Sequence, residues 1–159
     1  MMDEVSASPA PDWHVSQWFN TDPLTLTALR GKVIVLHAFQ MLCPGCVANG
    51  IPQAQRIARF FGPDHVAVIG LHTVFEHHEA MPPQALAAFI HEYRLTFPIG
   101  VDLPGKTGPI PQTMAAYAIQ GTPSLILIDR RGLMRKHALG TEEDMRVGAD
   151  IAFLLAEAG

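Results

Sequence analysis

Three short apolar stretches stand out in the pattern of hydrophobic and polar positions along the chain. They are residues 33–39 (VIVLHAF), 66–72 (VAVIGLH) and 124–129 (SLILID), each with the length of a buried strand. No apolar run approaches the roughly 18 residues that a membrane-spanning helix needs. A helix is predicted between the first two strands, ending at about residue 61 before Gly62-Pro63. Strand, helix and strand in this order predict a βαβ unit.

The second half of the chain predicts a further helix and a hairpin. After Pro82-Pro83, apolar residues recur at a helical spacing that predicts a helix packed onto the sheet; they are Leu86, Phe89, Ile90 and Tyr93. The passage FPIGVDLPGKTGPIPQ is expected to be mostly loop, with a short helix at QTMAAYA behind it. Residues 124–129 and 133–139 predict an antiparallel hairpin whose charged second strand suits a sheet edge. A last helix is expected from Thr141, because TEED resembles a capping box.

Composition and charge narrow the class of protein. With 159 residues, 48% hydrophobic and 16% charged, the chain is expected to form one globular domain at residues 13–159, preceded by a flexible N-terminal arm at residues 1–12. With a net charge of -4, the chain has no excess of basic residues, so its charge gives no indication of binding to nucleic acid or to an anionic membrane. Asp3 and Glu4 stand where a secretory signal would carry positive charge, so we expect a cytoplasmic location.

The two cysteines of the chain form a Cys-Pro-Gly-Cys turn between the first strand and its helix. If Cys43 is the N-cap and Pro44 the first helical residue, the backbone N–H groups of Gly45 and Cys46 point at the Cys43 sulfur. Those donors and the helix dipole favour the thiolate, so Cys43 is the predicted attacking group. Cys46 lies one helical turn deeper on the same face and is the predicted resolving thiol.

A metal site is the alternative chemistry for such a pair. With no third cysteine, the remaining ligands would have to be histidines, and His72, His77 and His78 are the candidates. The position between a buried strand and a helix favours a redox pair, so neither a metal nor another cofactor is expected. His37 is interpreted as a satisfied core residue. The loop Glu76-His77-His78-Glu79 could touch substrate, but we interpret it as solvated and without a fixed role.

These residues resemble the thioredoxin superfamily and, within it, the TlpA-like thiol-disulfide oxidoreductases (redoxins). LTLTALRGKVIVLHAF is similar to the family's entry into its central strand, the two cysteines match its redox pair, and LTFPIGVD resembles the segment after its inserted helix. The resemblance implies an α/β, thioredoxin-like fold, with a central mixed β-sheet flanked by α-helices and an inserted helix between the βαβ unit and a cis-proline strand. YAIQGTPSLILIDRRG resembles that last stretch, which places the cis-proline at Pro123 and Thr122 beside the disulfide. Cis peptide bonds in proteins occur almost only before proline, which agrees with this assignment.

The chain departs from the family pattern at three positions. Leu42 stands where the family usually has Trp before the first cysteine, and Pro52 is one residue further from the second cysteine than usual. Asn49 stands near the place of a proton-handling acid, so the group that deprotonates Cys46 is unassigned. The expected substrate contacts are Leu42, Pro44, Gly45, Thr122 and Pro123.

The leading hypothesis is a monomeric thiol-disulfide oxidoreductase that acts on protein or small-molecule disulfides and takes electrons from an unidentified donor. A peroxiredoxin-like thiol peroxidase is the second enzyme candidate. Its P-x-x-x-[ST]-x-x-C motif would need Pro at position 36 and Thr or Ser at position 40, where this chain has Leu36 and Gln40. A non-catalytic thioredoxin-like binding module and a metal carrier are the alternatives from other classes.

Overall fold

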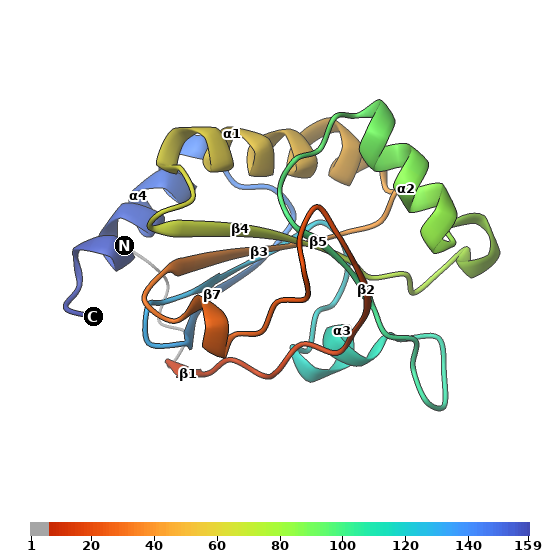
Figure 1. Cartoon of the computed structure of the whole chain (residues 1–159), viewed down its shortest axis with the longest axis horizontal. Helices are drawn as coiled ribbons and strands as arrows, with labels where there is room; N and C mark the ends of the chain where they lie inside the picture. Colours follow the sequence, from red (N-terminus) through yellow and green to blue (C-terminus); the bar gives the residue numbers. More distant parts are fainter. Residues whose placement is uncertain (1–6) are drawn as a thin grey trace.

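A mixed sheet of seven strands in the order β1-β7-β6-β3-β4-β5-β2 forms the centre of the computed structural model, which describes residues 7–159 (Figure 1). Its three central strands are β6 (Ser124–Ile128), β3 (Val33–Phe39) and β4 (Val66–His72). β3 runs parallel to β4 and antiparallel to β6. These strands are apolar along most of their length because both faces of the sheet are covered.

Within residues 7–159, shorter strands and four α-helices surround this centre. The strands are β1 (Ser8–Pro9), β2 (Val15–Phe19), β5 (Ile99–Asp102) and β7 (Leu133–Leu139). The helices are α1 (Ile51–Phe61), α2 (Pro83–Glu92), α3 (Gln112–Ala116) and α4 (Asp144–Ala156). No helix within residues 7–159 combines the length and the apolar character needed to cross a bilayer.

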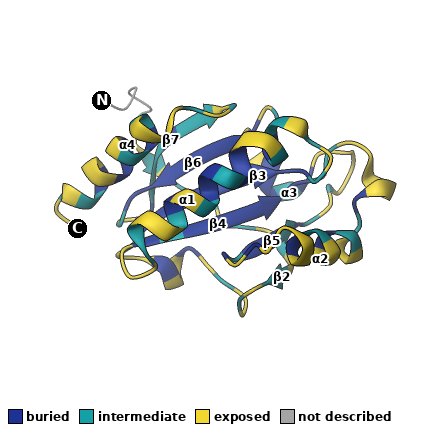
Figure 2. Ribbon diagram, turned by 90° about the horizontal axis from the view of Figure 1, so that it is seen from above, coloured by how far each residue is buried: buried dark blue, intermediate teal, exposed yellow. Residues whose placement is uncertain are grey.

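The sheet separates two hydrophobic cores. Helices α1, α2 and α4 pack over one face, and Figure 2 shows α1 lying over β3 and β4. On β3, Val33, Val35 and Phe39 point into this core, whereas Ile34 and Leu36 point into the core on the other face, which α3 covers. Alternate residues of one strand thus supply both cores, as a strand covered on both faces requires.

This architecture confirms the expected fold class. The strands predicted at 33–39, 66–72 and 124–129 and the hairpin to β7 are present, and α2 is the inserted helix between the βαβ unit and β6. Leu86 and Ile90 of α2 are buried as expected, whereas Tyr93 is half exposed.

The predicted flexible arm is wrong over residues 7–12, while residues 1–6 lie outside the described part of the chain. Ser8 and Pro9 pair with β7 as an antiparallel strand, and the Ala10 N–H donates to the Gly132 carbonyl at 3.0 Å. The Tyr117 hydroxyl donates to the carbonyl of Pro11. β1 pairs only with Leu133 and Met134 of β7, so the charged part of β7 lies at the edge of the sheet as predicted.

The passage at residues 97–112 is mostly loop as expected, but it also contains β5, which continues the sheet between β4 and β2. The start of the last helix differs from the expectation. The last helix begins at Asp144 and not at Thr141, and its N-cap, Glu143, makes no side-chain cap. The TEED residues are used in contacts with α1 instead: Gln53 donates to the Glu142 carbonyl at 2.6 Å, and Arg56 pairs with Asp144 at 2.6 Å. The hydrogen bond from Arg56, followed by that from Gln53, lowers the pKa of Asp144 to about 2.

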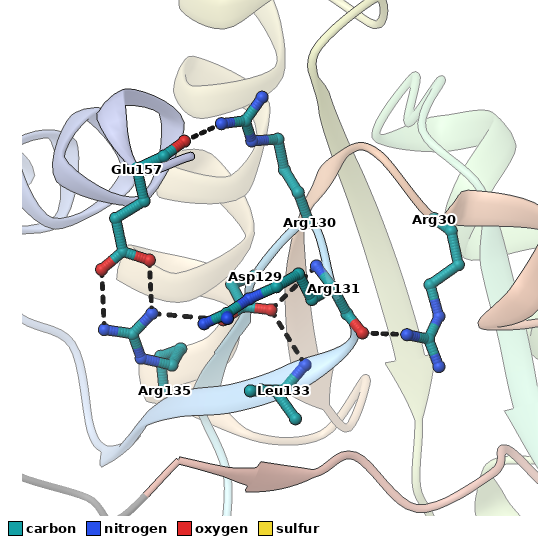
Figure 3. A network of polar contacts seen from close by, with 7 residues as sticks. All are labelled: Arg30, Asp129, Arg130, Arg131, Leu133, Arg135 and Glu157. Carbon is teal, nitrogen blue, oxygen red and sulfur yellow. Dashed lines mark hydrogen bonds and ion pairs between the residues drawn. The ribbon is translucent and has the colours of Figure 1, made fainter. Parts of the chain in front are cut away.

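A polar network fastens α4 to the hairpin at the far end of the sheet (Figure 3). The Asp129 carboxylate accepts hydrogen bonds from the backbone N–H groups of Arg131 and Leu133, at 2.9 and 3.0 Å. Arg135 bridges Asp129 and Glu157, at 3.2 and 2.6 Å. Burial alone would raise the pKa of Asp129, but the hydrogen bonds from Leu133, Arg135 and Arg131 leave it below its ordinary value.

Candidate active site

The predicted site residues lie at one end of the sheet, where β3 and β4 end and β6 begins. Phe39 is the register partner of His72, and Ala38 is the partner of Ser124. The segments that follow β3 and β4 and the segment that precedes β6 are therefore neighbours. They hold the two cysteines, the Glu76–Glu79 loop and Thr122-Pro123, respectively.

The two cysteines form a disulfide at the start of the helix that leads into α1, with their Cα atoms 5.2 Å apart. The Val47 N–H donates to the Cys43 carbonyl at 3.1 Å, so Cys43 is the N-cap and Pro44 the first helical residue. The Cys46 N–H lies 3.2 Å from the Cys43 sulfur. Cys46 is fully buried, whereas Cys43 is partly exposed. In the reduced protein this donor and the helix N-terminus favour a negative charge on Cys43.

Thr122 and Pro123 lie directly against the disulfide. Their peptide bond is cis, and the Thr122 carbonyl oxygen is 3.5 Å from the Cys43 sulfur. A Cβ added at Gly45 would lie 3.5 Å from the Pro123 ring, so the proline lies close to the redox turn. Leu42 is 58% exposed and presents an apolar side chain next to the disulfide. All the predicted substrate-contact positions are thus grouped around the two sulfurs.

The helix beyond Cys46 begins with a π-turn, Cys46–Gly50, in which the Ile51 N–H donates to the Cys46 carbonyl. A π-turn holds one more residue than an α-turn, so it accommodates the unusual spacing between Cys46 and Pro52. Pro52 lacks an N–H, and its ring would conflict with the carbonyl four residues earlier in a regular α-helix. The wider turn before Pro52 relieves that conflict.

Gly50, at the end of the π-turn, is a site residue that sequence reasoning missed. A Cβ at this position would lie 2.6 Å from Cε1 of His37 and 3.0 Å from Cβ of Pro123. His37 and Pro123 therefore close on the backbone of Gly50, and no larger residue fits without moving one of them. The unusual helix spacing was the available signal, but it did not identify the residue.

Two buried histidines lie behind the redox turn. His37 is 2% exposed and His72 is 1% exposed, and burial lowers the pKa of each to about 4. His72 Nε2 accepts a hydrogen bond from the Met41 N–H at 3.2 Å. His37 is a core residue as predicted, but it is not satisfied, since its Nε2 has no hydrogen-bond partner within residues 7–159.

The candidate metal ligands are not gathered around the cysteines. His72 bonds Met41, and His78 Nε2 donates to the Pro109 carbonyl at 3.0 Å. Within residues 7–159 there is no group of three or more His, Cys, Asp or Glu side chains that could hold a metal ion.

The Glu76–Glu79 loop is exposed, as interpreted, but it has fixed contacts. Besides the His78 bond to Pro109, Oε1 of Glu76 lies 3.5 Å from Nε2 of the buried Gln40, and the Phe75 N–H donates to Gln40 Oε1 at 3.2 Å. A buried side chain that follows β3 thus holds one end of this exposed loop.

A cavity of about 440 Å³ lies between the redox turn, Pro123 and the segment that leads into α4. The redox turn contributes Gly45 and Asn49 to its wall, and Pro123 also lines it. The other lining residues are the loop 140–144 and Arg56. The Gly140 N–H donates to the Pro123 carbonyl at 2.8 Å and holds this loop against the proline.

Comparison with known proteins defines the class. Residues 7–137 match the AhpC/TSA family. A crystal structure of a thioredoxin-like superfamily protein is 59% identical with a TM-score of 0.93, covering 95% of this chain and 98% of that one. A thiol-disulfide isomerase from Corynebacterium glutamicum is 47% identical with a TM-score of 0.91, covering 94% and 97%. StoA from Bacillus subtilis, at 21% identity and a TM-score of 0.69 over 88% and 96%, shares the fold. No curated protein matches significantly.

The fold and the C-x-x-C pair beside Pro123 define a thioredoxin-like redox protein. The chain belongs to the AhpC/TSA family and is a thiol-disulfide oxidoreductase of thioredoxin-like fold.

Proposed function

We propose that Cys43 is the attacking thiolate and Cys46 the resolving thiol in the reduction or exchange of disulfides. The observation that carries this division is their unequal environment: Cys43 is partly exposed at a helix N-cap, with the Cys46 N–H 3.2 Å from its sulfur, while Cys46 is fully buried. A thiolate at a helix N-terminus is the more nucleophilic species near neutral pH.

The reaction has two exchange steps. The Cys43 thiolate attacks one sulfur of a substrate disulfide, forming a mixed disulfide and releasing the other substrate sulfur as a thiolate, which takes a proton from solvent. Cys46 then loses its proton and attacks the Cys43 sulfur. The second substrate sulfur leaves as a thiolate, which takes up a proton from solvent, and the Cys43–Cys46 disulfide remains. The substrate has gained two electrons, and a dithiol donor returns them to the protein in each cycle.

The proposed substrate site is the surface around Thr122 and Pro123. The backbone of Thr122 borders the sulfur of Cys43, and an extended polypeptide could pair with it as an added strand. Exposed Leu42, together with Pro44 and Gly45, would form the other side of this site.

Trapping of mixed disulfides tests the division of roles. Cys46→Ser should accumulate covalent partner adducts on non-reducing gels, because without the resolving thiol only an outside reductant can release Cys43. Cys43→Ser should trap little, since its remaining sulfur is buried. The adducts should disappear with dithiothreitol, and the double variant serves as the background control.

Two results would contradict the proposal. One is preferential trapping by Cys43→Ser, which would reverse the roles of the two cysteines. The other is recovery of the same partner by the double variant when neither single variant captures it covalently. That result would favour the non-catalytic binding module.

The thiol peroxidase alternative has weaker support than disulfide exchange. Leu36 and Gln40 occupy the positions where its motif needs Pro and Thr or Ser, and both are buried in other contacts.

We propose in addition that the protein acts as a monomer in the cytoplasm, which sedimentation and cell fractionation would test. The direction of electron flow depends on the reduction potential of the Cys43–Cys46 couple.

A further inference from the structure

Gln40 is a buried polar residue at the centre of the loops that surround the disulfide. It follows β3 directly and is 1% exposed. Its backbone carbonyl accepts the Cys43 N–H at 3.2 Å, so the residue also begins the turn that carries the cysteines. A buried amide in this position requires hydrogen-bond partners, and the partners are what connect it to the site.

The side chain of Gln40 reaches two other segments. Its Oε1 accepts the Phe75 N–H at 3.2 Å, and its Nε2 lies 3.5 Å from Oε1 of Glu76. The same Nε2 lies 3.5 Å from Oγ1 of Thr122. One side chain therefore joins the redox turn, the loop after β4 and the residue before the cis-proline.

The contact with Thr122 is the one with chemical consequences. Thr122 holds its carbonyl oxygen 3.5 Å from the Cys43 sulfur, and its backbone borders any polypeptide bound there. A threonine side chain that is hydrogen-bonded through Oγ1 keeps one orientation, and this limits the movement of the attached backbone. Gln40 itself is buried and does not reach the surface on which a substrate would lie.

We propose that Gln40 is a positioning residue that aligns Thr122 and the Phe75–Glu76 loop for polypeptide disulfides. The inference rests on the proposed function and deepens it. To bind a polypeptide disulfide, the protein must hold its own backbone at Thr122 and at the Phe75–Glu76 loop in place around the reacting sulfurs. A small disulfide needs only access to the Cys43 sulfur. Gln40 therefore governs the preference for polypeptides over small disulfides.

Two probes with the same leaving group test this preference. One is dithiobis-nitrobenzoate, and the other is an unstructured peptide whose single cysteine is a mixed disulfide with nitrothiobenzoate. In both reactions the reduced protein releases the coloured nitrothiobenzoate, so the two second-order rate constants can be compared directly. Gln40→Met keeps the length of the side chain and removes its hydrogen bonds. The peptide rate constant should fall about three- to tenfold, with the small-reagent constant unchanged, given a net hydrogen-bond contribution of about 1 kcal/mol.

Further variants separate positioning from general destabilisation. Thr122→Val removes the hydroxyl that Gln40 contacts and should lower the same ratio, and the double variant should lose no more than the larger single effect because both remove one contact. Gln112→Met is the matched control. It removes a glutamine hydrogen bond to the Pro104 carbonyl, 3.0 Å long and outside the site, and should leave the ratio unchanged.

The outcomes distinguish this inference from the proposed function. If the unmodified protein reacts with both probes but Gln40→Met changes neither rate, or changes both equally, Gln40 has no positioning role. Fully additive effects of Gln40→Met and Thr122→Val would also overturn it. If the reduced, unmodified protein reacts with neither probe at Cys43, the proposed function itself fails.

Discussion

At the residue scale, His37 and His72 couple the stability of the protein to pH. Burial lowers the pKa of each to about 4 from an ordinary value of 6.5. Between these two values the unfolded chain binds more protons than the folded one, so acidification favours unfolding. The stability associated with the neutral side chains is complete above about pH 6.5 and declines toward pH 4.

We predict that the free energy of unfolding falls between pH 6.5 and pH 5 by up to about 1.4 kcal/mol per pH unit for each histidine. His37→Leu should reduce this slope, because it removes one of the two buried groups that titrate. The substitution breaks no hydrogen bond at Nε2, which has no partner within residues 7–159. Urea unfolding of the oxidised protein at several pH values measures the slope. His91→Gln changes an exposed histidine and should leave the slope as it is in the unmodified protein. An unchanged slope in His37→Leu would mean that His37 is not buried in its neutral form.

At the element scale, the π-turn before α1 decides how the redox helix meets the cis-proline. The turn holds an extra residue between Cys46 and Pro52, and it ends at Gly50, where His37 and Pro123 leave no room for a side chain. The buried face of α1 can then continue with Ile51, Ala54 and Ile57 against the sheet.

Gly50→Ala should destabilise the protein by about 1–3 kcal/mol, because the added methyl group must displace the His37 ring or Pro123. It should also slow the reaction of Cys43 with the peptide probe, since Pro123 borders the disulfide. Gly148→Ala is the control. Gly148 lies inside α4 with open space around it, and alanine there should be neutral or stabilising by up to about 1 kcal/mol. Thermal or urea unfolding measures both, and equal effects of the two substitutions would rule out the close packing at Gly50.

At the scale of the whole molecule, charges are unevenly distributed between the two ends of the sheet. Glu76 lies beside Gln40, and Glu142, Glu143 and Asp144 line the cavity next to the redox turn. Lys136 pairs with Glu142, and Arg56 pairs with Asp144. At the far end, around the β6–β7 hairpin, arginines gather (Figure 3); they are Arg30, Arg130, Arg131 and Arg135. The exposed Glu76 and Glu143 therefore give the end that carries the redox pair a negative charge toward an approaching substrate.

This distribution predicts that a peptide probe with lysines beside its cysteine reacts faster than one with glutamates. The difference should be about two- to fivefold at low ionic strength and should decrease as salt is added, because exposed charges contribute up to about 1 kcal/mol and are screened. Glu143→Gln should reduce the preference. Asp64→Asn makes the same change of charge before the start of β4, at the opposite end, and should leave it intact. Equal rates for the two peptides at low salt would contradict a negative charge at the redox end.

The amino-acid sequence by itself determined the central strands, the βαβ unit and the place of the redox pair. Apolar runs such as 33–39 and 66–72 report burial directly, and the Cys-Pro-Gly-Cys turn carries its own local signals for a helix start. The sequence of the final helix was less informative, because TEED satisfies a local capping pattern while its residues contact Gln53 and Arg56 of α1.

Only the tertiary structure decided the edges of the sheet and the surroundings of the disulfide. β1 is two residues long and forms because the backbone of β7 has unpaired hydrogen-bonding groups beside it. Two residues are too few to carry a sequence pattern that predicts a strand. Gln40 and Gly50 are inconspicuous in the sequence for the same reason. Gln40 meets Thr122 across 82 positions of the chain, and Gly50 is required by His37 and Pro123. Periodicity and local propensity predict which face of a segment is buried. The side chains that surround the disulfide depend on contacts between segments that are distant in the sequence and meet only in the folded protein.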